Sequence, residues 1–135
     1  MIVVDTNLIA YAVVPGERTD AALAVLGVDP QWVAPPLWRS ELRNALLTTM
    51  RAGKLTLAGA LGAFEEADRL VSDVGLEEET EACLRMAEKV KISAYDAEFV
   101  LAAERLGLPL VSADRKLSKA FPGRVLSPEE FVAGT

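Results

Sequence analysis

The chain has 135 residues, 51% of them hydrophobic, and a net charge of −6 at pH 7, which is typical of one soluble globular domain that we expect to span residues 1–135. No apolar run reaches the roughly 20 residues that cross a membrane, and the N-terminus lacks a signal-peptide pattern, so we expect a cytoplasmic protein without membrane contacts. Histidine is absent, which excludes His-based catalytic relays and His-containing zinc sites and leaves oxygen ligands for any metal.

The first half of the chain alternates short apolar runs with helical patterns. Breaks at Pro15-Gly16, at Gly27 and at Pro35-Pro36 separate the expected elements. Thr19 or Asp20 can cap the second helix. We expect a strand at 2–4, a helix at 6–14, a helix at 19–26, a strand at 31–34, and a helix from 36 to about 50.

The second half continues the alternation. Cys83 lies in a helical apolar pattern, so we expect this thiol in the core. Ser127 and Pro128 are suited to open a short C-terminal helix. We expect helices at 57–72, 77–89, 93–106 and 115–121, and strands at 74–76, 108–113 and 124–126. Strands that alternate with helices indicate an α/β fold with a parallel sheet covered by helices on both faces.

Two aspartates follow buried strands directly. Asp5 comes after the apolar run 1–4, and Asp114 comes after the run 108–113. In parallel α/β sheets, the ligand crevice lies beyond the carboxyl ends of the strands. We therefore expect Asp5 and Asp114 to be neighbours in a site.

Two more acids fall on the apolar side of expected helices. At about 100° per residue, Glu41 lies between Leu37 and Ala45, and Asp96 lies on the face that Tyr95, Phe99, Val100, Ala102, Ala103 and Leu106 would form. A carboxylate turned toward a core is costly unless it is paired or binds a metal. The four acids from four segments are therefore expected to converge on a cation.

Each acid also has a purely structural explanation. Asp5 and Asp114 could cap the helices that follow them, and Asp96 could belong to a capping box opened by Ser93. Glu41 could be an ordinary surface residue. These explanations do not account for two acids inside apolar arcs and two more at the ends of apolar runs, so we favour a shared site.

An all-carboxylate site favours Mg²⁺ or Mn²⁺. Such an ion activates water and neutralises charge on a phosphate, which makes metal-dependent phosphodiester hydrolysis the expected chemistry. The chain has no glycine-rich phosphate loop, which argues against an ATPase or kinase.

The acidic composition argues against a nucleic-acid partner, but basic residues lie beside the acids. Arg39 and Arg43 are on the helix of Glu41, and Arg115 and Lys116 follow Asp114. We expect these four residues to bind substrate, although solvated surface charge explains any one of them equally well.

The chain resembles the PIN-domain ribonucleases, and among them the VapC-like toxins of toxin-antitoxin pairs. The resemblance covers nearly the whole chain. It rests on Val3-Val4-Asp5-Thr6-Asn7, on Glu41-Leu42, on Ser93-Ala94-Tyr95-Asp96-Ala97, and on the run from Leu106 to Leu117 that contains Ser112-Ala113-Asp114.

The resemblance implies a five-stranded parallel sheet of order 3-2-1-4-5 and a ribonuclease that uses a metal-activated water. It implies that Asp5, Glu41, Asp96 and Asp114 hold Mg²⁺ or Mn²⁺ and that Ser112, Asn7 and Thr6 support them. It also implies an RNA substrate, an antitoxin partner and a homodimer. Some relatives have a further acid after the last aspartate, and residues 115–118 supply none, which disfavours a second tightly bound metal.

Two alternatives remain open. A housekeeping PIN ribonuclease would have the same site. A receiver-like regulatory domain with a Mg²⁺ pocket would need paired acids after the first strand and an aspartate at the end of a central strand. Asp5 is followed by Thr6 and Asn7, and no mid-chain strand is expected to end in an aspartate, so this alternative is the weaker one.

Overall fold

The computed structural model describes residues 1–76 and 79–134 as a parallel sheet surrounded by helices. Most elements begin and end within a few residues of the expected positions. In chain order they are β1 (Ile2–Val4), α1 (Thr6–Val13), α2 (Thr19–Val28), β2 (Trp32–Ala34), α3 (Leu37–Arg51), α4 (Leu57–Leu70), β3 (Val71–Asp73), α5 (Thr80–Val90), α6 (Ala94–Leu106), β4 (Leu110–Val111), α7 (Arg115–Ala120), β5 (Val125–Leu126) and α8 (Pro128–Ala133).

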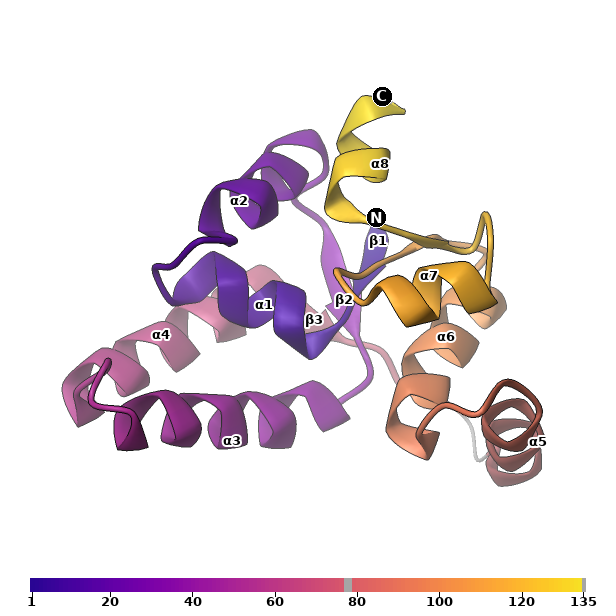
Figure 1. The fold of residues 1–135 in the computed structure, drawn as a ribbon, viewed down its shortest axis with the longest axis horizontal. Helices are drawn as coiled ribbons and strands as arrows, with labels where there is room; N and C mark the ends of the chain where they lie inside the picture. The colour runs from indigo at the N-terminus through magenta and orange to yellow at the C-terminus, as the bar shows by residue number, and fades with distance from the viewer. Residues whose placement is uncertain (77–78, 135) are drawn as a thin grey trace.

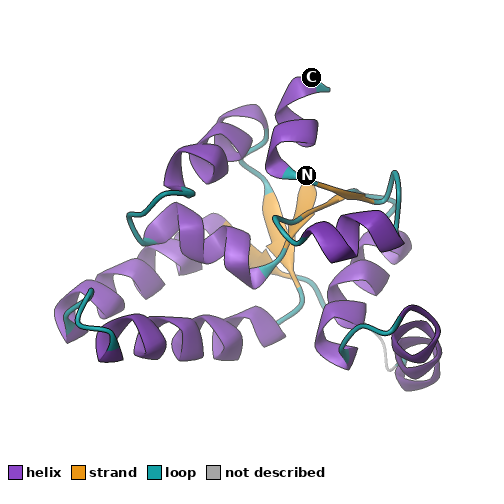
Figure 2. Cartoon of the chain, in the orientation of Figure 1, coloured by secondary structure: helices purple, strands orange, loops and turns teal. Residues whose placement is uncertain are grey.

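The sheet has five parallel strands in the order β3-β2-β1-β4-β5, which confirms the expected fold class. Figure 1 shows helices α1 to α4 on one side of the sheet and α5 to α7 on the other, and Figure 2 shows the strands enclosed between these two groups. Strand β1 lies at the centre, and its residues Ile2, Val3 and Val4 are buried. Because β1 has neighbours on both edges and helices on both faces, its apolar run is continuous.

The third strand begins three residues earlier than the sequence indicates. Helix α4 ends at Leu70, and Val71 pairs with Trp32 of β2, whereas the expected strand was 74–76. The side chain of Asp73 fixes this position, because its Oδ1 accepts a hydrogen bond of 2.7 Å from Trp38 Nε1. A mid-chain strand thus does end in an aspartate, contrary to expectation. It is an edge strand, and its carboxylate is already bonded to α3, so it does not provide a receiver-like pocket.

Helix α2 is not capped by Thr19 or Asp20 in the expected way. The residue before the helix, Arg18, makes no side-chain cap bond. The Thr19 hydroxyl instead accepts a bond from the Gly16 N–H and donates one to the Val14 carbonyl. This hydroxyl closes the turn between α1 and α2, where the sequence showed only a Pro-Gly break.

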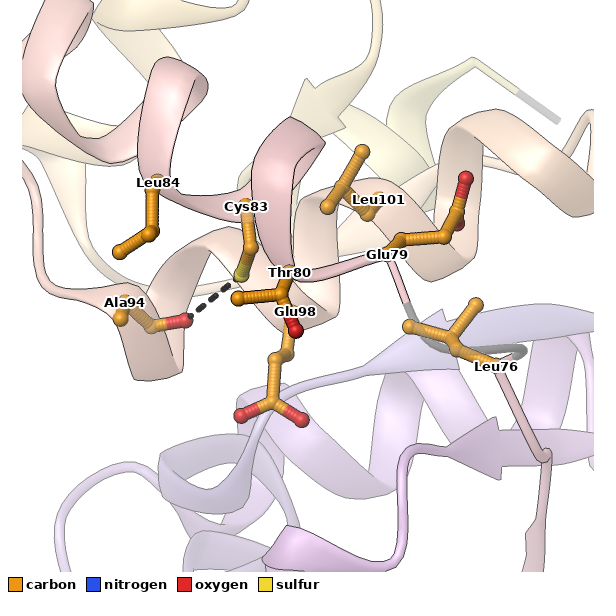
Figure 3. Close-up of a pocket in the computed structure, with 8 residues that line it drawn as sticks. All are labelled: Leu76, Glu79, Thr80, Cys83, Leu84, Ala94, Glu98 and Leu101. Atoms are coloured by element: carbon orange, nitrogen blue, oxygen red, sulfur yellow. Dashed lines mark hydrogen bonds between the residues drawn. The ribbon is translucent and has the colours of Figure 1, made fainter.

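Helix α5 packs on α6 and buries none of its own residues fully, so the prediction that Cys83 belongs to the core is wrong. The thiol is half-buried and donates a weak hydrogen bond of 3.4 Å to the Ala94 carbonyl. Figure 3 shows Cys83, Leu84 and Glu98 around a cavity of about 340 Å³ between the two helices. The expected start of this helix at residues 77–78 lies outside the described residues. None of the described helices combines the length and apolar character needed to cross a bilayer.

Candidate metal centre

The pairing of the two central strands brings Asp5 and Ser112 together. Val4 of β1 is in register with Val111 of β4, so the residues that follow them emerge side by side. The Ser112 hydroxyl donates a hydrogen bond of 2.5 Å to Asp5 Oδ2, and Ser112 Oγ accepts one of 3.1 Å from the Asp114 N–H. Ser112 is 1% exposed. This buried serine therefore connects both strand-end aspartates, which lie 109 positions apart in the sequence numbering.

Both strand-end aspartates also cap helices. Asp5 Oδ1 accepts a bond of 3.0 Å from the Leu8 N–H at the start of α1. Asp114 Oδ1 accepts bonds from the N–H groups of Lys116 and Leu117 in α7. The structural and the functional explanations of these residues are thus compatible. Capping uses one oxygen of each carboxylate and fixes the direction of the other.

Asp96 enters the same region from the first turn of α6. Ser93 caps this helix and accepts a hydrogen bond of 3.0 Å from the Asp96 N–H. Desolvation by burial raises the pKa of Asp96, and the charge of Asp114 raises it further. Opposing effects come from Ser93 and from the nearby charge of Lys116. Asp96 and Asp114 are therefore close enough to repel each other.

Burial raises the pKa of Asp5 to about 6. The hydrogen bonds from Ser112 and Leu8 lower this pKa, and the charges of Asp96 and Asp114 raise it. Three acids from β1, α6 and the β4–α7 turn consequently act on one another. A cation between them would remove both the desolvation cost and the repulsion.

Glu41 reaches the edge of this region through Thr6. The Thr6 hydroxyl, which is buried, donates a hydrogen bond of 2.7 Å to Glu41 Oε1. Glu41 and Thr6 share a cavity of about 470 Å³ with Asn7, Ser40, Asn44 and Tyr95. Asn7 is exposed, and no hydrogen bond from its side chain to an acid is seen among the described residues.

Sequence reasoning overlooked two polar residues of this cavity and misplaced one aromatic residue. Ser40 and Asn44 lie one and three residues from Glu41 on α3. These spacings could have indicated that both side chains line the same cavity as Glu41. Tyr95 was expected on the apolar face of its helix but is 60% exposed. The buried positions of α6 begin at Ala97, so Tyr95 in its first turn lies outside the core. Leu106, at the other end of the same expected face, is also exposed.

The donor set suits a hard divalent cation. Among the residues that the structure describes, no three acidic or thiol side chains lie close enough together to hold a metal ion as they stand. The acids nevertheless supply only oxygen donors, and three of them repel one another. Mg²⁺ typically binds one or two carboxylates and keeps several waters, so a loose cluster fits this ion better than it fits zinc or calcium.

The two arginines of α3 point away from the acids. Arg39 Nη1 lies 2.5 Å from Asp68 Oδ1, Arg39 Nε lies 3.1 Å from Asp73 Oδ2, and the guanidinium covers the Trp38 ring at 4.7 Å. The Arg43 guanidinium lies 5.0 Å from the centre of the Phe64 ring. Arg39 and Arg43 therefore connect α3 to α4 and β3, which argues against our expectation that they meet the substrate first.

The other two expected contacts lie beside the acids. Lys116 Nζ donates a hydrogen bond of 3.1 Å to the Lys91 carbonyl, and its charge lowers the pKa of Asp96. Arg115 is exposed, and within the described part of the chain it forms no ion pair. Positive charge near the acids thus comes from α7 rather than from α3.

Arg39→Ala tests this assignment. The substitution removes two ion pairs and leaves Asp68 without its cation, so we expect it to lower the free energy of unfolding by about 1 to 2 kcal/mol. RNA affinity and its salt dependence should match those of the parent protein. Urea unfolding measures the change in stability, and RNA binding across a salt series measures the affinity and its salt dependence. Arg43→Ala, which removes the other arginine of α3 and its contact with the Phe64 ring, is the matched control. If Arg39→Ala left stability unchanged and made RNA binding less dependent on salt, Arg39 would be assigned as a substrate contact after all.

The raised pKa of Asp5 predicts a pH dependence of stability in the metal-free protein. Between pH 4 and pH 6 the folded state keeps a proton on Asp5 that the unfolded state, with a pKa near 3.8, releases. The favourable contribution is therefore complete below about pH 4 and is lost as the pH rises through about 6. Above that pH the ionised group costs about 2 to 3 kcal/mol. We expect the stability difference between Asp5→Asn and the parent, measured in EDTA, to grow over this interval. A difference independent of pH would mean that Asp5 titrates normally.

Comparison with known proteins gives a matching family model, one similar ribonuclease and two similar solved structures. A family model described as the PIN domain matches residues 2–121. Ribonuclease VapC3 of Pyrobaculum aerophilum is 29% identical over 127 residues, which cover 92% of this chain and 97% of that protein. The crystal structure of PAE2754 from the same organism superposes with a TM-score of 0.79 at 22% identity, covering 98% of this chain and 94% of that one. A toxin-antitoxin complex from Klebsiella pneumoniae gives a TM-score of 0.67 at 18% identity, covering 95% and 98%.

Proposed function

Because the chain belongs to the PIN-domain family, we propose that it is a Mg²⁺- or Mn²⁺-dependent ribonuclease and that it serves as the toxin of a toxin-antitoxin pair. The observation that carries the proposal is the bridge made by Ser112. It joins Asp5 to the backbone of Asp114 at the carboxyl edge of the sheet, within electrostatic reach of Asp96.

The likeness to Ribonuclease VapC3 supports RNA as the substrate, because it extends over nearly the full length of both proteins. The fold shared with a toxin-antitoxin complex supports an antitoxin partner. A homodimer and a location in the cytoplasm are part of the same proposal. A housekeeping ribonuclease would have the same site, and the presence of a small antitoxin gene beside this one distinguishes the two.

Each residue of the site has a separate task in the proposed reaction. A divalent ion, when bound, supplies activation of water and neutralisation of the charge on the phosphate. Asp5, Asp96 and Asp114 would hold that ion, and Glu41, which accepts the Thr6 hydrogen bond, would add a carboxylate from the α3 side. Ser112 and Thr6 orient Asp5 and Glu41 by hydrogen bonds, as groups behind metal ligands commonly do. Lys116, beside Asp96, is placed to meet an RNA phosphate.

Expression of the chain in a bacterial host tests the biological part of the proposal. We expect induction to stop growth, coexpression of the neighbouring small gene to restore it, and Asp96→Asn to remove the inhibition. Glu98→Gln, two residues along α6, is the matched control and should remain inhibitory. Normal growth on induction of the folded parent protein would contradict a toxin role and would leave a housekeeping ribonuclease as the better assignment.

A further inference from the structure

A polar cavity lies next to the turn between β4 and α7, the turn that carries Asp114. It has a volume of about 340 Å³ and is lined by Tyr11 of α1, Arg18 before α2, Ala113 and Arg115 on either side of Asp114, and Ser127 and Glu129 at the start of α8. Three separate parts of the chain thus form its wall. Ala113 and Arg115 flank Asp114 in the chain, so the cavity adjoins the turn that holds this acid.

The wall of this cavity has an excess of positive charge. Arg18 Nη1 lies 2.9 Å from Glu129 Oε1, and this hydrogen bond lowers the pKa of Glu129, with a smaller contribution from the charge of Arg115. Two guanidinium groups therefore face one carboxylate. The Tyr11 hydroxyl and the Ser127 hydroxyl add groups that can donate hydrogen bonds. This combination suits a dianionic or monoanionic oxygen ligand such as a phosphate.

An RNA strand needs such a site here. The chain carries a net charge of −6, and the acids that hold the metal repel a polyanion. Arg39 and Arg43 are bound to α4 and β3, so they do not supply the missing charge. The cavity with Arg18 and Arg115 supplies it immediately beside Asp114.

We propose that the cavity formed by Tyr11, Arg18, Arg115 and Ser127 binds a backbone phosphate of the RNA that neighbours the phosphate being cleaved. The proposal rests on the proposed ribonuclease function. Since the contact is to the backbone, it contributes affinity and alignment and does not select the sequence. Glu129 forms an ion pair with Arg18 and so competes with the phosphate for the guanidinium. This ion pair therefore lowers the affinity of the site for RNA.

Charge variants in a cleavage-dead protein test the cavity. The protein carries Asp5→Asn, EDTA is present, and the probe is a short single-stranded oligoribonucleotide of mixed sequence. We expect Arg18→Gln and Arg115→Gln each to weaken binding about threefold to tenfold and to reduce the slope of log affinity against log salt by about 0.7. Glu129→Gln should act in the opposite direction and tighten binding.

Arg85→Gln on α5 is the matched control. Arg85 also pairs with a single glutamate, Glu81, at 3.6 Å, so the substitution changes net charge and removes an exposed ion pair in the same way. We expect it to leave binding unchanged. Arg18 and Glu129 are 40% and 60% exposed, and exposed pairs contribute little to stability, so the variants should stay folded.

Two results would overturn the phosphate site. The first is that Arg18→Gln and Arg115→Gln bind the RNA with the same affinity, and the same slope of log affinity against log salt, as Arg85→Gln. The second is that Glu129→Gln binds the RNA more weakly than the cleavage-dead parent. Cleavage of the same RNA by the protein with Asp5 intact, in Mn²⁺, separates the two proposals. If that protein cleaves and the variants bind like the control, only the phosphate site fails. If it does not cleave, the ribonuclease function fails, and the binding series still decides the cavity.

Discussion

Asp5→Asn is expected to abolish RNA cleavage and, at the same time, to stabilise the metal-free protein at neutral pH. Asparagine keeps the shape of the side chain, so Oδ1 can still accept the Leu8 N–H, and the amide can bond to Ser112 Oγ. The negative charge that we propose binds the ion is lost. Removing a residue that only hydrogen-bonds a metal ligand typically lowers metal affinity or activity about 10- to 100-fold. Loss of a ligand itself should therefore lower the rate of RNA cleavage by more than about a hundredfold.

The gain in stability has the same origin. Burial raises the pKa of Asp5 to about 6, so the ionised group destabilises the fold at pH 7. A neutral residue should recover about 1 to 3 kcal/mol, measured by urea unfolding in EDTA. Asp29→Asn is a control of opposite sign. Burial raises the pKa of Asp29, but hydrogen bonds from the N-terminal ammonium and the Gln31 N–H outweigh it and lower the pKa. That variant should be less stable and fully active. A folded Asp5→Asn protein that cleaves at the parent rate would remove Asp5 from the site.

Mn²⁺ is expected to raise the melting temperature of the parent protein well above the value in EDTA. An ion that binds only the folded state adds about 2.7 kcal/mol at a free concentration one hundred times its dissociation constant. For a domain of this size, that corresponds to about 10 °C. We expect this gain because an ion bound at Asp5, Asp96 and Asp114 would relieve the repulsion among them.

The double variant Asp96→Asn, Asp114→Asn should lose this difference between Mn²⁺ and EDTA. Glu98→Gln with Glu104→Gln is the control, because it removes two charges from α6 outside the acidic cluster. It should keep the full shift. Thermal unfolding followed by circular dichroism measures all three proteins, each in Mn²⁺ and in EDTA. An equal shift in the parent and the Asp96, Asp114 double variant would place the ion elsewhere.

Strands β1, β2, β4 and β5 and the strand-end acids Asp5 and Asp114 were predictable because their signal is local. A short apolar run predicts a buried strand, and an aspartate directly after it is predicted to lie at the carboxyl edge of the sheet. Asp5 and Asp114 are both examples. The third strand was misplaced for a physical reason. Val71 begins no apolar run, because Ser72 and Asp73 follow it. Its place in the sheet depends instead on pairing with Trp32 and on the bond from Trp38 to Asp73.

The surroundings of the site were less predictable, because they depend on contacts between distant segments. Arg39 stands two positions before Glu41, yet its direction is decided by Asp68 and Asp73, which follow 29 and 34 residues later. The cavity that contains Arg18 combines α1, the residue before α2, the region around the β4–α7 turn and the start of α8, and it has no local pattern in the sequence. The prediction for Cys83 was wrong because a helical apolar pattern does not reveal that α5 packs chiefly on α6 and buries none of its own residues fully.

The most direct measurement of the central claim is cleavage of a defined RNA by the purified parent protein and by Asp5→Asn, each in Mn²⁺ and in EDTA, with analysis of the product ends. We predict cleavage only by the parent in Mn²⁺, with 5′-phosphate and 3′-hydroxyl ends, because water attacks the phosphorus and the 3′ oxygen leaves. Cleavage that persists in EDTA, or products ending in a 2′,3′-cyclic phosphate, would contradict a metal-dependent hydrolysis at these acids.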